Sequence, residues 1–357
     1  MTPLSPAFLG SRRAEVDGAV DLAVARIERR MQPFGGAFAD LGAAMRRATK
    51  GGKRFRPTLV VATFDALGGV EADTPALYPV AASFELLHAA FLMHDDILDH
   101  DTLRRGVPNV SGEFRAYAEG HGADAAGSAL LGDAAGLLAG DLLLHESQRL
   151  IALAPTAEGA RDRLLNLLDE AVLVSAAGEL ADIANSLRED APEAAAILAA
   201  THDKTAVYSF AAPLRAGAVL AGADESTESD LARYGSRLGL AFQLVDDLIG
   251  AFGTSEQAGK PEGADLREAK QTALIALARA TTAWPDVRTA LAEAHTGPIA
   301  VRRAQSALDA SGARAALGQL VQQSLSDARA VLRDAELPLP ARELLGALAD
   351  AVEARVP

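Results

Sequence analysis

Apolar residues recur every three or four positions along most of this chain, which is the spacing of one face of an α-helix. Alternating β-branched residues, the mark of a half-buried strand, are scarce. The helical pattern therefore predicts an all-α protein. The predicted helical stretches cover residues 14–31, 37–49, 75–100, 128–153, 158–187, 191–221, about 227–250 and most of 265–355, with loops near 295 and 311.

Glycine, proline and polar residues interrupt this pattern at a few places. Residues 106–127 are rich in glycine and polar residues and predict a mobile connection, and residues 253–263 predict a loop. Pro57 is placed near the start of a further helix, where proline is tolerated. There is no internal repeat and no linker rich in proline and serine. We therefore expect a single domain over residues 1–357, built from about ten or more helices.

Composition narrows the class of protein. The 357 residues are 49% hydrophobic and 23% charged, which is ordinary for a soluble globular protein. The chain has no cysteine, which excludes disulfides and thiolate metal sites, and its net charge of −14 disfavours nonspecific binding of nucleic acid. No apolar run reaches about 18 residues and the N-terminus lacks a signal-peptide pattern, so we expect no transmembrane segment and a cytoplasmic location.

Two aspartate clusters adjoin apolar stretches. Asp95 and Asp99 lie four residues apart and share a helix face, with Asp96 beside them. Asp246 and Asp247 lie in the stretch 227–250. Burying carboxylates without a partner costs several kcal/mol, and clustered carboxylate oxygens are typical ligands of Mg²⁺. The alternative, a solvated acidic helix end, fits poorly with the apolar neighbours, so the sequence predicts a magnesium site.

Several cations could face an anionic ligand. Arg104-Arg105 follow the first aspartate cluster, and arginine presents a fork of donors that matches phosphate oxygens. Lys53 and Arg56 lie in the sequence GGKRFRP, beside a glycine pair and before a predicted helix, where backbone N–H groups also favour anions. For each there is a plainer interpretation: an ion pair of Arg104 with Asp99 or Asp101, or a basic loop between helices.

In order along the chain, these motifs resemble those of the trans-isoprenyl diphosphate synthases, also called polyprenyl synthetases, over about residues 50–275. No single motif is specific, but seven in the family order are. The motifs are GGKRxRP at residues 51–57, DDxxD at 95–99, RRG at 104–106, GD at Gly140-Asp141, KT at Lys204-Thr205 and FQxxDD at 242–247, with GK at 259–260 and KxT at 270–272 counted together as the seventh. The chain departs from the family pattern at two positions. It has Gly250 where the family often has a third aspartate, and Gln271 where the family usually has an arginine.

The resemblance implies a reaction and a fold. In this family, isopentenyl diphosphate is joined head to tail to an allylic diphosphate after the allylic C–O bond ionises. The fold it implies is an all-α bundle around a deep central cavity. No covalent nucleophile is needed, and the main task is to stabilise the departing negative charge. The family also implies three Mg²⁺ ions per active site and a homodimer.

The resemblance also assigns roles to individual residues. The Mg²⁺ ligands would be Asp95, Asp96, Asp99, Asp246 and Asp247. The allylic diphosphate would be held by Arg104, Lys204, Lys260 and Lys270, with Thr205 and Gln243 nearby. Isopentenyl diphosphate would be bound by Lys53, Arg56, His88 and Arg105.

Product length should depend on the helical turn before the first aspartate. Phe91 lies four residues before Asp95 and Ala90 five, and one turn of helix rises about 5.4 Å. In the family, bulk at these positions stops the growing tail. The pair Ala90 and Phe91 favours a C20 product, with C15 next. The alternative is that Phe91 packs against a neighbouring helix and has no influence on length.

Three other classes of protein stay open. A class I terpene cyclase shares the fold and the first acidic cluster, but its usual Asn/Ser/Glu metal triad is missing near residues 240–255. A helical metal phosphohydrolase could use His94-Asp95, which would leave the motifs at 104–106 and 242–247 unexplained. A noncatalytic subunit of a heteromeric synthase is compatible with Gly250, although both acidic pairs and the cations are present.

Overall fold

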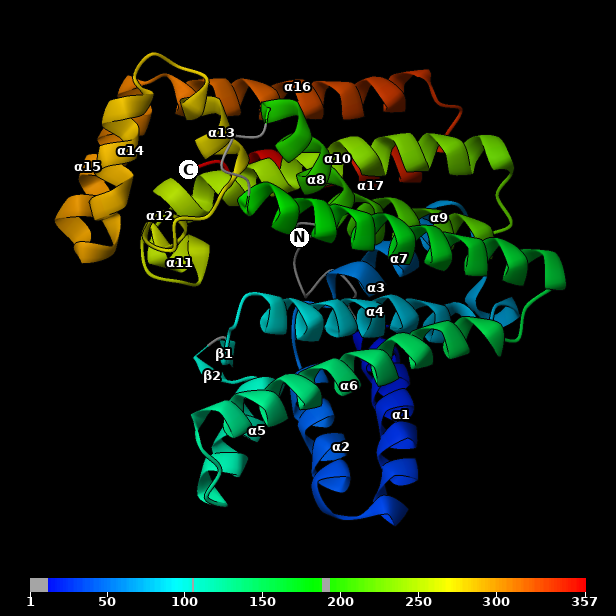
Figure 1. The fold of residues 1–357 in the computed structure, drawn as a ribbon. Helices are drawn as coiled ribbons and strands as arrows, with labels where there is room; N and C mark the ends of the chain where they lie inside the picture. Colours follow the sequence, from blue (N-terminus) through cyan, green and yellow to red (C-terminus); the bar gives the residue numbers. More distant parts are fainter. Residues whose placement is uncertain (1–11, 105, 188–192) are drawn as a thin grey trace. The chain divides into compact units, whose positions relative to one another are not determined.

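The structure is a computed structural model, and it describes residues 12–104, 106–187 and 193–357. The described residues are almost entirely helical, which confirms the predicted all-α class (Figure 1). They divide into two compact units. The first unit runs to Asn166 and includes Ala216–Gly222; the second includes Leu167–Arg215 and Ala223–Pro357. The expectation of one domain stays a prediction, and each unit is described by itself below.

The elements follow one another in the order predicted by the hydrophobic pattern. The boundary between the two units, at Asn166, lies within α7. The elements up to and including α7 are α1 (Arg13–Met31), η2 (Gln32–Phe34), α2 (Gly36–Thr49), α3 (Phe55–Ala66), η3 (Glu71–Asp73), α4 (Leu77–Leu98), β1 (Leu103–Arg104), β2 (Val107–Pro108), α5 (Val110–Gly120), α6 (Ala125–Ala152) and α7 (Glu158–Ser186). Those that follow are α8 (Ala194–Ala206), η4 (Val207–Ala211), α9 (Ala212–Leu220), α10 (Glu225–Phe252), α11 (Ser255–Ala258), α12 (Ala264–Arg267), α13 (Ala273–Arg279), α14 (Trp284–Glu293), η5 (Ala294–Thr296), α15 (Pro298–Ala310), α16 (Ala313–Asp334) and α17 (Leu339–Glu353).

The first unit is organised around α4. This helix packs along α6 and also contacts α1 and α3, while α5 lies against α6 (Figure 1). Leu86, Ala90 and Met93 lie on one face of α4 and are buried in a cluster with residues of α1, α2, α5 and α6. The opposite face, with Asp95 and Asp99, is less buried. The apolar spacing of α4 therefore selects the face that packs, and leaves the acidic face out of this core.

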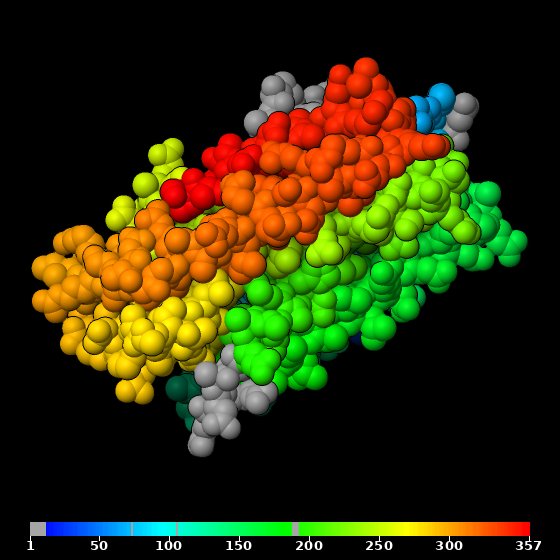
Figure 2. Space-filling model, turned by 90° about the horizontal axis from the view of Figure 1, so that it is seen from above, coloured from blue at the N-terminus to red at the C-terminus, as the bar shows by residue number. Residues whose placement is uncertain are grey.

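The second unit is organised around α10, which packs against α8, η4, α16 and α17. Figure 2 shows α16, in orange, on the surface of this unit, with the red C-terminal helix α17 beside it. The element η4 is a π-helix whose five residues are all buried. It begins two residues after Thr205, at Val207, and short π-helical segments are frequent at functional sites.

The prediction that residues 106–127 form a mobile connection is wrong. It contains strand β2, paired antiparallel with β1, and the whole of α5. Asn109 caps α5 by accepting a hydrogen bond from the Gly112 N–H at 2.8 Å, and Phe114 and Ala118 are buried. An N-cap residue followed by apolar residues four apart is a helix signal, and the glycines of this segment obscured it.

One described helix, α6, is long and apolar enough to cross a membrane by length and composition alone. That is weak evidence, because the core helix of a folded unit passes the same test. One face of α6 is core: Ala139 and Leu143 are fully buried. The fully buried Glu146 accepts a hydrogen bond from Arg26 of α1 at 2.9 Å. Packing inside the first unit thus explains much of the apolar character of α6.

Candidate functional site

The first acidic cluster lies at the C-terminal end of α4. Asp96 is buried, Asp95 is half-buried and Asp99 is exposed at the helix cap. Two glycines of α6 let this part of α4 come close: a Cβ atom at Gly136 would lie 3.0 Å from Ile97, and one at Gly140 would lie 2.2 Å from the His94 ring. The glycine of the Gly140-Asp141 motif therefore has a packing role.

Arg104 holds this cluster. It donates hydrogen bonds to one oxygen of Asp96 from Nε at 3.0 Å and from Nη2 at 2.5 Å, and its Nη2 lies 3.8 Å from Asp95. The β1–β2 hairpin positions Arg104, which pairs with Val107. Burial raises the pKa of Asp96, and the hydrogen bond and charge of Arg104 oppose that rise. Arg104 therefore partly neutralises a buried carboxylate, and its partners are Asp95 and Asp96 rather than Asp99 or Asp101.

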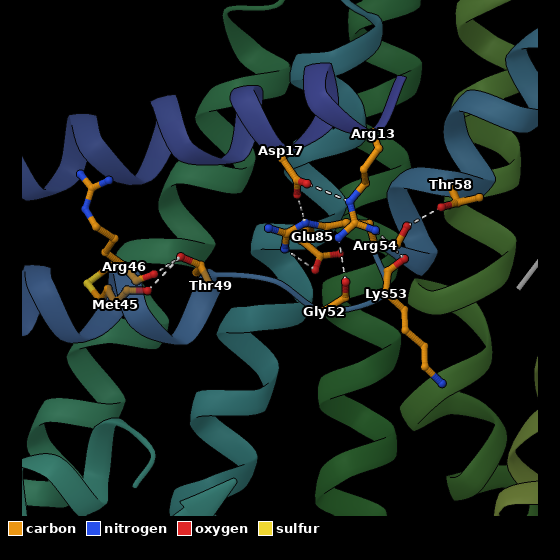
Figure 3. A network of polar contacts seen from close by, with 10 residues as sticks. All are labelled: Arg13, Asp17, Met45, Arg46, Thr49, Gly52, Lys53, Arg54, Thr58 and Glu85. Atoms are coloured by element: carbon orange, nitrogen blue, oxygen red, sulfur yellow. Dashed lines mark hydrogen bonds and ion pairs between the residues drawn. The ribbon is translucent and has the colours of Figure 1, made fainter. Parts of the chain in front are cut away.

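A buried arginine of the basic loop before α3, Arg54, anchors the loop to neighbouring helices (Figure 3). The side chain of Arg54 is 3% exposed and pairs with Asp17 of α1 at 2.7 Å and with Glu85 of α4 at 2.8 Å. The backbone at Arg54 has a φ of 51°, and Gly51 and Gly52 also have positive φ. This tight path follows from the glycine pair, since glycine adopts positive φ without steric cost.

Helix α1 also contacts the backbone of this loop. Arg13 donates hydrogen bonds to the carbonyl oxygens of Gly52, at 2.8 Å, and Lys53, at 3.4 Å. The exposed Lys53 side chain extends away from this network (Figure 3). Arg54 was not among the predicted site residues. Its position in a basic segment close to a glycine pair could have suggested a role for Arg54. The neighbouring residues in the sequence, however, do not indicate that its partners lie in α1 and α4.

The second acidic cluster lies in α10 of the second unit. Asp247 is 7% exposed and accepts hydrogen bonds from the Ala273 N–H at 3.1 Å and from Gln243 at 3.4 Å. Burial raises the pKa of Asp247 to about 7, and the charges of Asp246 and Asp265 add to this rise. Gln243, predicted to lie near the substrate, therefore contacts the acidic cluster directly.

Asp246 is paired with Arg355, which lies two residues beyond the end of α17. The Arg355 Nη2 contacts the Asp246 carboxylate, and the guanidinium lies over the Phe242 ring at 4.3 Å. Arg355 was missed because it lies 109 residues from Asp246 in the sequence. In each acidic cluster an arginine thus contacts a carboxylate: Arg104 contacts Asp96 and Asp95 in the first cluster, and Arg355 contacts Asp246 in the second.

Lys204, which was predicted to lie within the helical stretch 191–221, lies near the end of α8 and contacts two acids of α7. Its Nζ is 3.0 Å from Glu179 and 3.4 Å from Asp182. These two acids were not predicted as site residues, and they could have been considered because Asp182 follows Glu179 by three residues on one helix face. The contacts show that Lys204 is more than a solvated side chain of an exposed helix.

The other predicted residues are distributed over both units. Thr205 follows Lys204, and the exposed Lys260 and Lys270 lie on either side of α12. His88, Phe91 and Arg56 are half-buried, the first two on the face of α4 that carries Asp95. Arg105 lies outside the described residues. Ala90 is fully buried in the core cluster of the first unit.

The residues present fit Mg²⁺ by their chemistry. Both clusters offer only carboxylate oxygens, and Mg²⁺ is typically bound by one or two carboxylates together with water and substrate phosphates. In the described part of the chain, no three His, Cys, Asp or Glu side chains are gathered closely enough to hold a metal by themselves. A cation bound partly through waters and phosphate does not need such a cage.

Comparison with known proteins gives a family match. The family model for polyprenyl synthetase matches residues 39–308. A short chain isoprenyl diphosphate synthase of Methanothermobacter thermautotrophicus is 33% identical over 65% of this chain and 65% of its own length. A geranylgeranyl diphosphate synthase of Mycobacterium tuberculosis is 32% identical over 94% of this chain and 89% of its own. Several relatives are matched over only 55% to 68% of their length.

A solved structure is also similar. The geranylgeranyl pyrophosphate synthase of Corynebacterium glutamicum, complexed with isoprenyl diphosphate and magnesium, is 30% identical to this chain. The alignment covers 95% of this chain and 97% of that one, with a TM-score of 0.86. The helical arrangement described above therefore follows that of a prenyl diphosphate synthase along nearly its whole length.

Proposed function

Because the chain belongs to the polyprenyl synthetase family, we propose that it is a trans-prenyltransferase that joins isopentenyl diphosphate head to tail to an allylic diphosphate. The observation that carries this proposal is the family match over residues 39–308, which includes both acidic clusters and the basic loop. The proposed product is a trans-prenyl diphosphate. A C20 chain is favoured, and a C15 chain is the second choice.

The proposed roles follow from the chemistry of ionisation. By the family resemblance, the carboxylates of Asp95, Asp96, Asp99, Asp246 and Asp247 would hold up to three Mg²⁺ ions. When bound, Mg²⁺ neutralises the negative charge that develops on the departing pyrophosphate. Arg104, Lys204, Lys260 and Lys270 would donate hydrogen bonds to the same diphosphate. Arg104 and Lys204 are held in place by nearby carboxylates.

The basic loop is proposed to bind isopentenyl diphosphate. Lys53, Arg56 and His88 would pair with its phosphates, with Arg105 as a fourth contact. The support is the rigidity of the loop: Arg54 and Arg13 hold its backbone while the Lys53 side chain extends away from them. Preorganised cations lose less conformational entropy when they bind an anion, so they bind it more tightly.

Phe91 is proposed to limit the length of the product. Its position four residues before Asp95 places it on the acidic face of α4 rather than on the face that packs into the core. Ala90 is proposed only as the small neighbour of Phe91. Enlarging Ala90 would force extra volume into a fully buried position and would destabilise the first unit.

A homodimer is proposed through the exposed face of α6. Leu130, Leu137 and Leu138 are 72%, 52% and 48% exposed on this helix. Apolar side chains gathered on one helix face commonly mark an interface, and the family implies that a second copy covers it. Light scattering at low micromolar concentration should give a particle of twice the 37.0 kDa chain mass. A cytoplasmic location is part of the same proposal.

The test is a condensation assay with radiolabelled isopentenyl diphosphate. The primers would be dimethylallyl, geranyl and farnesyl diphosphate, with and without excess EDTA, and the products would be separated by chromatography. We expect Mg²⁺-dependent formation of C20 or C15 diphosphate and no product in EDTA. Condensation that continues in EDTA would refute the metal assignment. No condensation with any primer, in protein that binds both substrates, would favour a noncatalytic subunit of a heteromeric synthase.

A further inference from the structure

Arg54 belongs to the loop proposed to bind isopentenyl diphosphate, but its own side chain is directed into the protein. Only 3% of this side chain is exposed. Its Nε donates a hydrogen bond to Asp17 of α1 at 2.7 Å, and its Nη1 donates one to Glu85 of α4 at 2.8 Å. The two acids neutralise the guanidinium, and burial keeps it from a ligand outside. Whatever Arg54 contributes to binding must therefore act through the groups around it.

The backbone at Arg54 decides how the loop enters α3. Its φ of 51° is left-handed, which is unfavourable for a residue with a Cβ atom. Its carbonyl oxygen accepts hydrogen bonds from the Thr58 N–H at 2.9 Å and from the Thr58 hydroxyl at 2.6 Å (Figure 3). Lys53 precedes this N-cap residue directly, and Arg56 is the second residue of α3. The conformation held at Arg54 therefore sets the directions in which Lys53 and Arg56 leave the chain.

Asp17 connects two arginines that hold the loop. One of its oxygens accepts a hydrogen bond from Nε of Arg13 at 2.8 Å, and the other accepts the bond from Arg54. Arg13 in turn donates to the carbonyl oxygen of Gly52 at 2.8 Å (Figure 3). The loop is thus tied to α1 both through its backbone and through a side chain, and Asp17 is shared by the two ties.

Glu85 connects the loop to the helix that carries His88. His88 follows Glu85 by three residues in α4, so the two side chains lie on the same side of that helix. The pair between Arg54 and Glu85 therefore fixes the loop relative to His88, and all of these residues lie in the first unit. Hydrogen bonds weaken steeply with poor distance and angle, so the affinity for a diphosphate depends on this spacing.

We propose that Arg54 is a positioning residue for isopentenyl diphosphate. Together with Asp17 and Glu85, it sets the positions of Lys53, Arg56 and His88, and thereby the affinity of the site, without touching the ligand itself. This inference rests on the proposed function, in which those three cations bind isopentenyl diphosphate. It explains why the middle cation of the sequence KRFR is buried between two acids while the exposed Lys53 beside it extends away from the network.

The first experiment separates positioning from general stability. Arg54→Ala should raise KM for isopentenyl diphosphate about tenfold or more, and should leave KM for the allylic substrate within about twofold of wild type. Arg54→Lys keeps the charge but lacks the fork that reaches both acids, so its KM should lie between the two. Arg26→Ala is the matched control. It breaks an ion pair of the same unit, with the fully buried Glu146, and should leave both KM values unchanged.

Circular dichroism and thermal unfolding would verify that each variant is folded. A wild-type KM for isopentenyl diphosphate in folded Arg54→Ala would overturn the inference. So would an equal rise of both KM values, or the same rise in Arg26→Ala, because either result would mean that the loss follows from a weakened fold rather than from the position of the loop.

The second experiment tests whether Arg54 acts through its acids, and it also serves if Arg54→Ala does not fold. Asp17→Asn and Glu85→Gln should each raise KM for isopentenyl diphosphate about threefold or more, although each removes negative charge near the proposed anion site. If Arg54 were itself a ligand, removing an acid beside it would lower this KM. Arg54→Ala combined with Glu85→Gln should be no worse than Arg54→Ala alone, because both changes break one contact. A lowered KM in either acid variant, or additive effects in the double variant, would contradict the positioning role.

A binding measurement separates these outcomes from failure of the proposed function. Isothermal titration calorimetry of the full chain with isopentenyl diphosphate, in EDTA, requires no turnover. If the wild-type protein makes no prenyl diphosphate but binds isopentenyl diphosphate, and Arg54→Ala binds it about tenfold more weakly, the positioning role stands and the proposed activity fails. If the wild-type protein is active and Arg54→Ala binds and reacts normally, only the role of Arg54 fails.

Discussion

Replacing Asp247 with asparagine should stabilise the metal-free protein at neutral and alkaline pH. The carboxyl group is 7% exposed, and burial raises its pKa to about 7 from an ordinary value of 3.8. In the unfolded chain the group ionises near its ordinary pKa. Between these two values the folded state holds a proton that the unfolded state has lost, so the stability of the wild-type protein falls as the pH rises from about 4 to about 7.

The size of the effect follows from the displacement of this pKa. One pH unit corresponds to about 1.4 kcal/mol, so a pKa that moves from 3.8 to about 7 sets a ceiling of about 4 kcal/mol at pH 8. Asparagine carries no charge to bury, but it keeps only one acceptor oxygen for the donors at Ala273 and Gln243. That loss acts at every pH and costs about 1 kcal/mol. The net gain at pH 8 should be a few kcal/mol, and near zero or negative at pH 5.

Urea unfolding followed by circular dichroism, in EDTA and at fixed protein concentration, would measure this difference at pH 5, 6, 7 and 8. Asp334→Asn, which changes an exposed acid of the same unit, should follow the wild-type curve. Mg²⁺ with pyrophosphate should reverse the order, because the ionised Asp247 then gains a cation. The reasoning is refuted if the difference between Asp247→Asn and wild type is the same at pH 5 and pH 8, or if the wild type is the more stable at pH 8.

Three further predictions follow from packing and charge. Phe91→Ala should lengthen the main product by at least one C5 unit, and an unchanged product distribution by chromatography would remove the basis of the C20 proposal. Lys53→Ala should raise KM for isopentenyl diphosphate about tenfold or more, through loss of a charge-assisted hydrogen bond, and should leave KM for the allylic substrate nearly unchanged; equal effects on both substrates would contradict the assignment. Gly140→Ala should destabilise the protein by about 1–3 kcal/mol, because the added methyl meets the His94 ring, whereas Gly346→Ala, with open space around it in α17, should be stabilising or neutral in thermal unfolding. Equal behaviour of the two glycine variants would show that α4 and α6 are not in close contact at Gly140.

The sequence by itself determined the helices, because their signal is local. The three-to-four-residue spacing of apolar side chains follows from the geometry of the helix, so α4, α6, α7 and α10 begin and end within a few residues of the predicted bounds. The same local geometry put Asp95 and Asp99 on one face of α4. The exception, α5, had a local signal as well, in the cap at Asn109 and the buried Phe114, which the surrounding glycines concealed.

Only the tertiary structure decided the state of the charged residues. The sequence gives Asp246 and Asp247 the same formal charge and adjacent positions. Packing then buries Asp247, pairs Asp246 with an arginine 109 residues away, and brings Asp265 into the space beside Gly250. Burial and charge pairing depend on which distant segments meet, and no local pattern of residues specifies that. Arg54 illustrates the same point, since its partners Asp17 and Glu85 lie in two other helices, and they turn an arginine of a basic loop into a buried support for that loop.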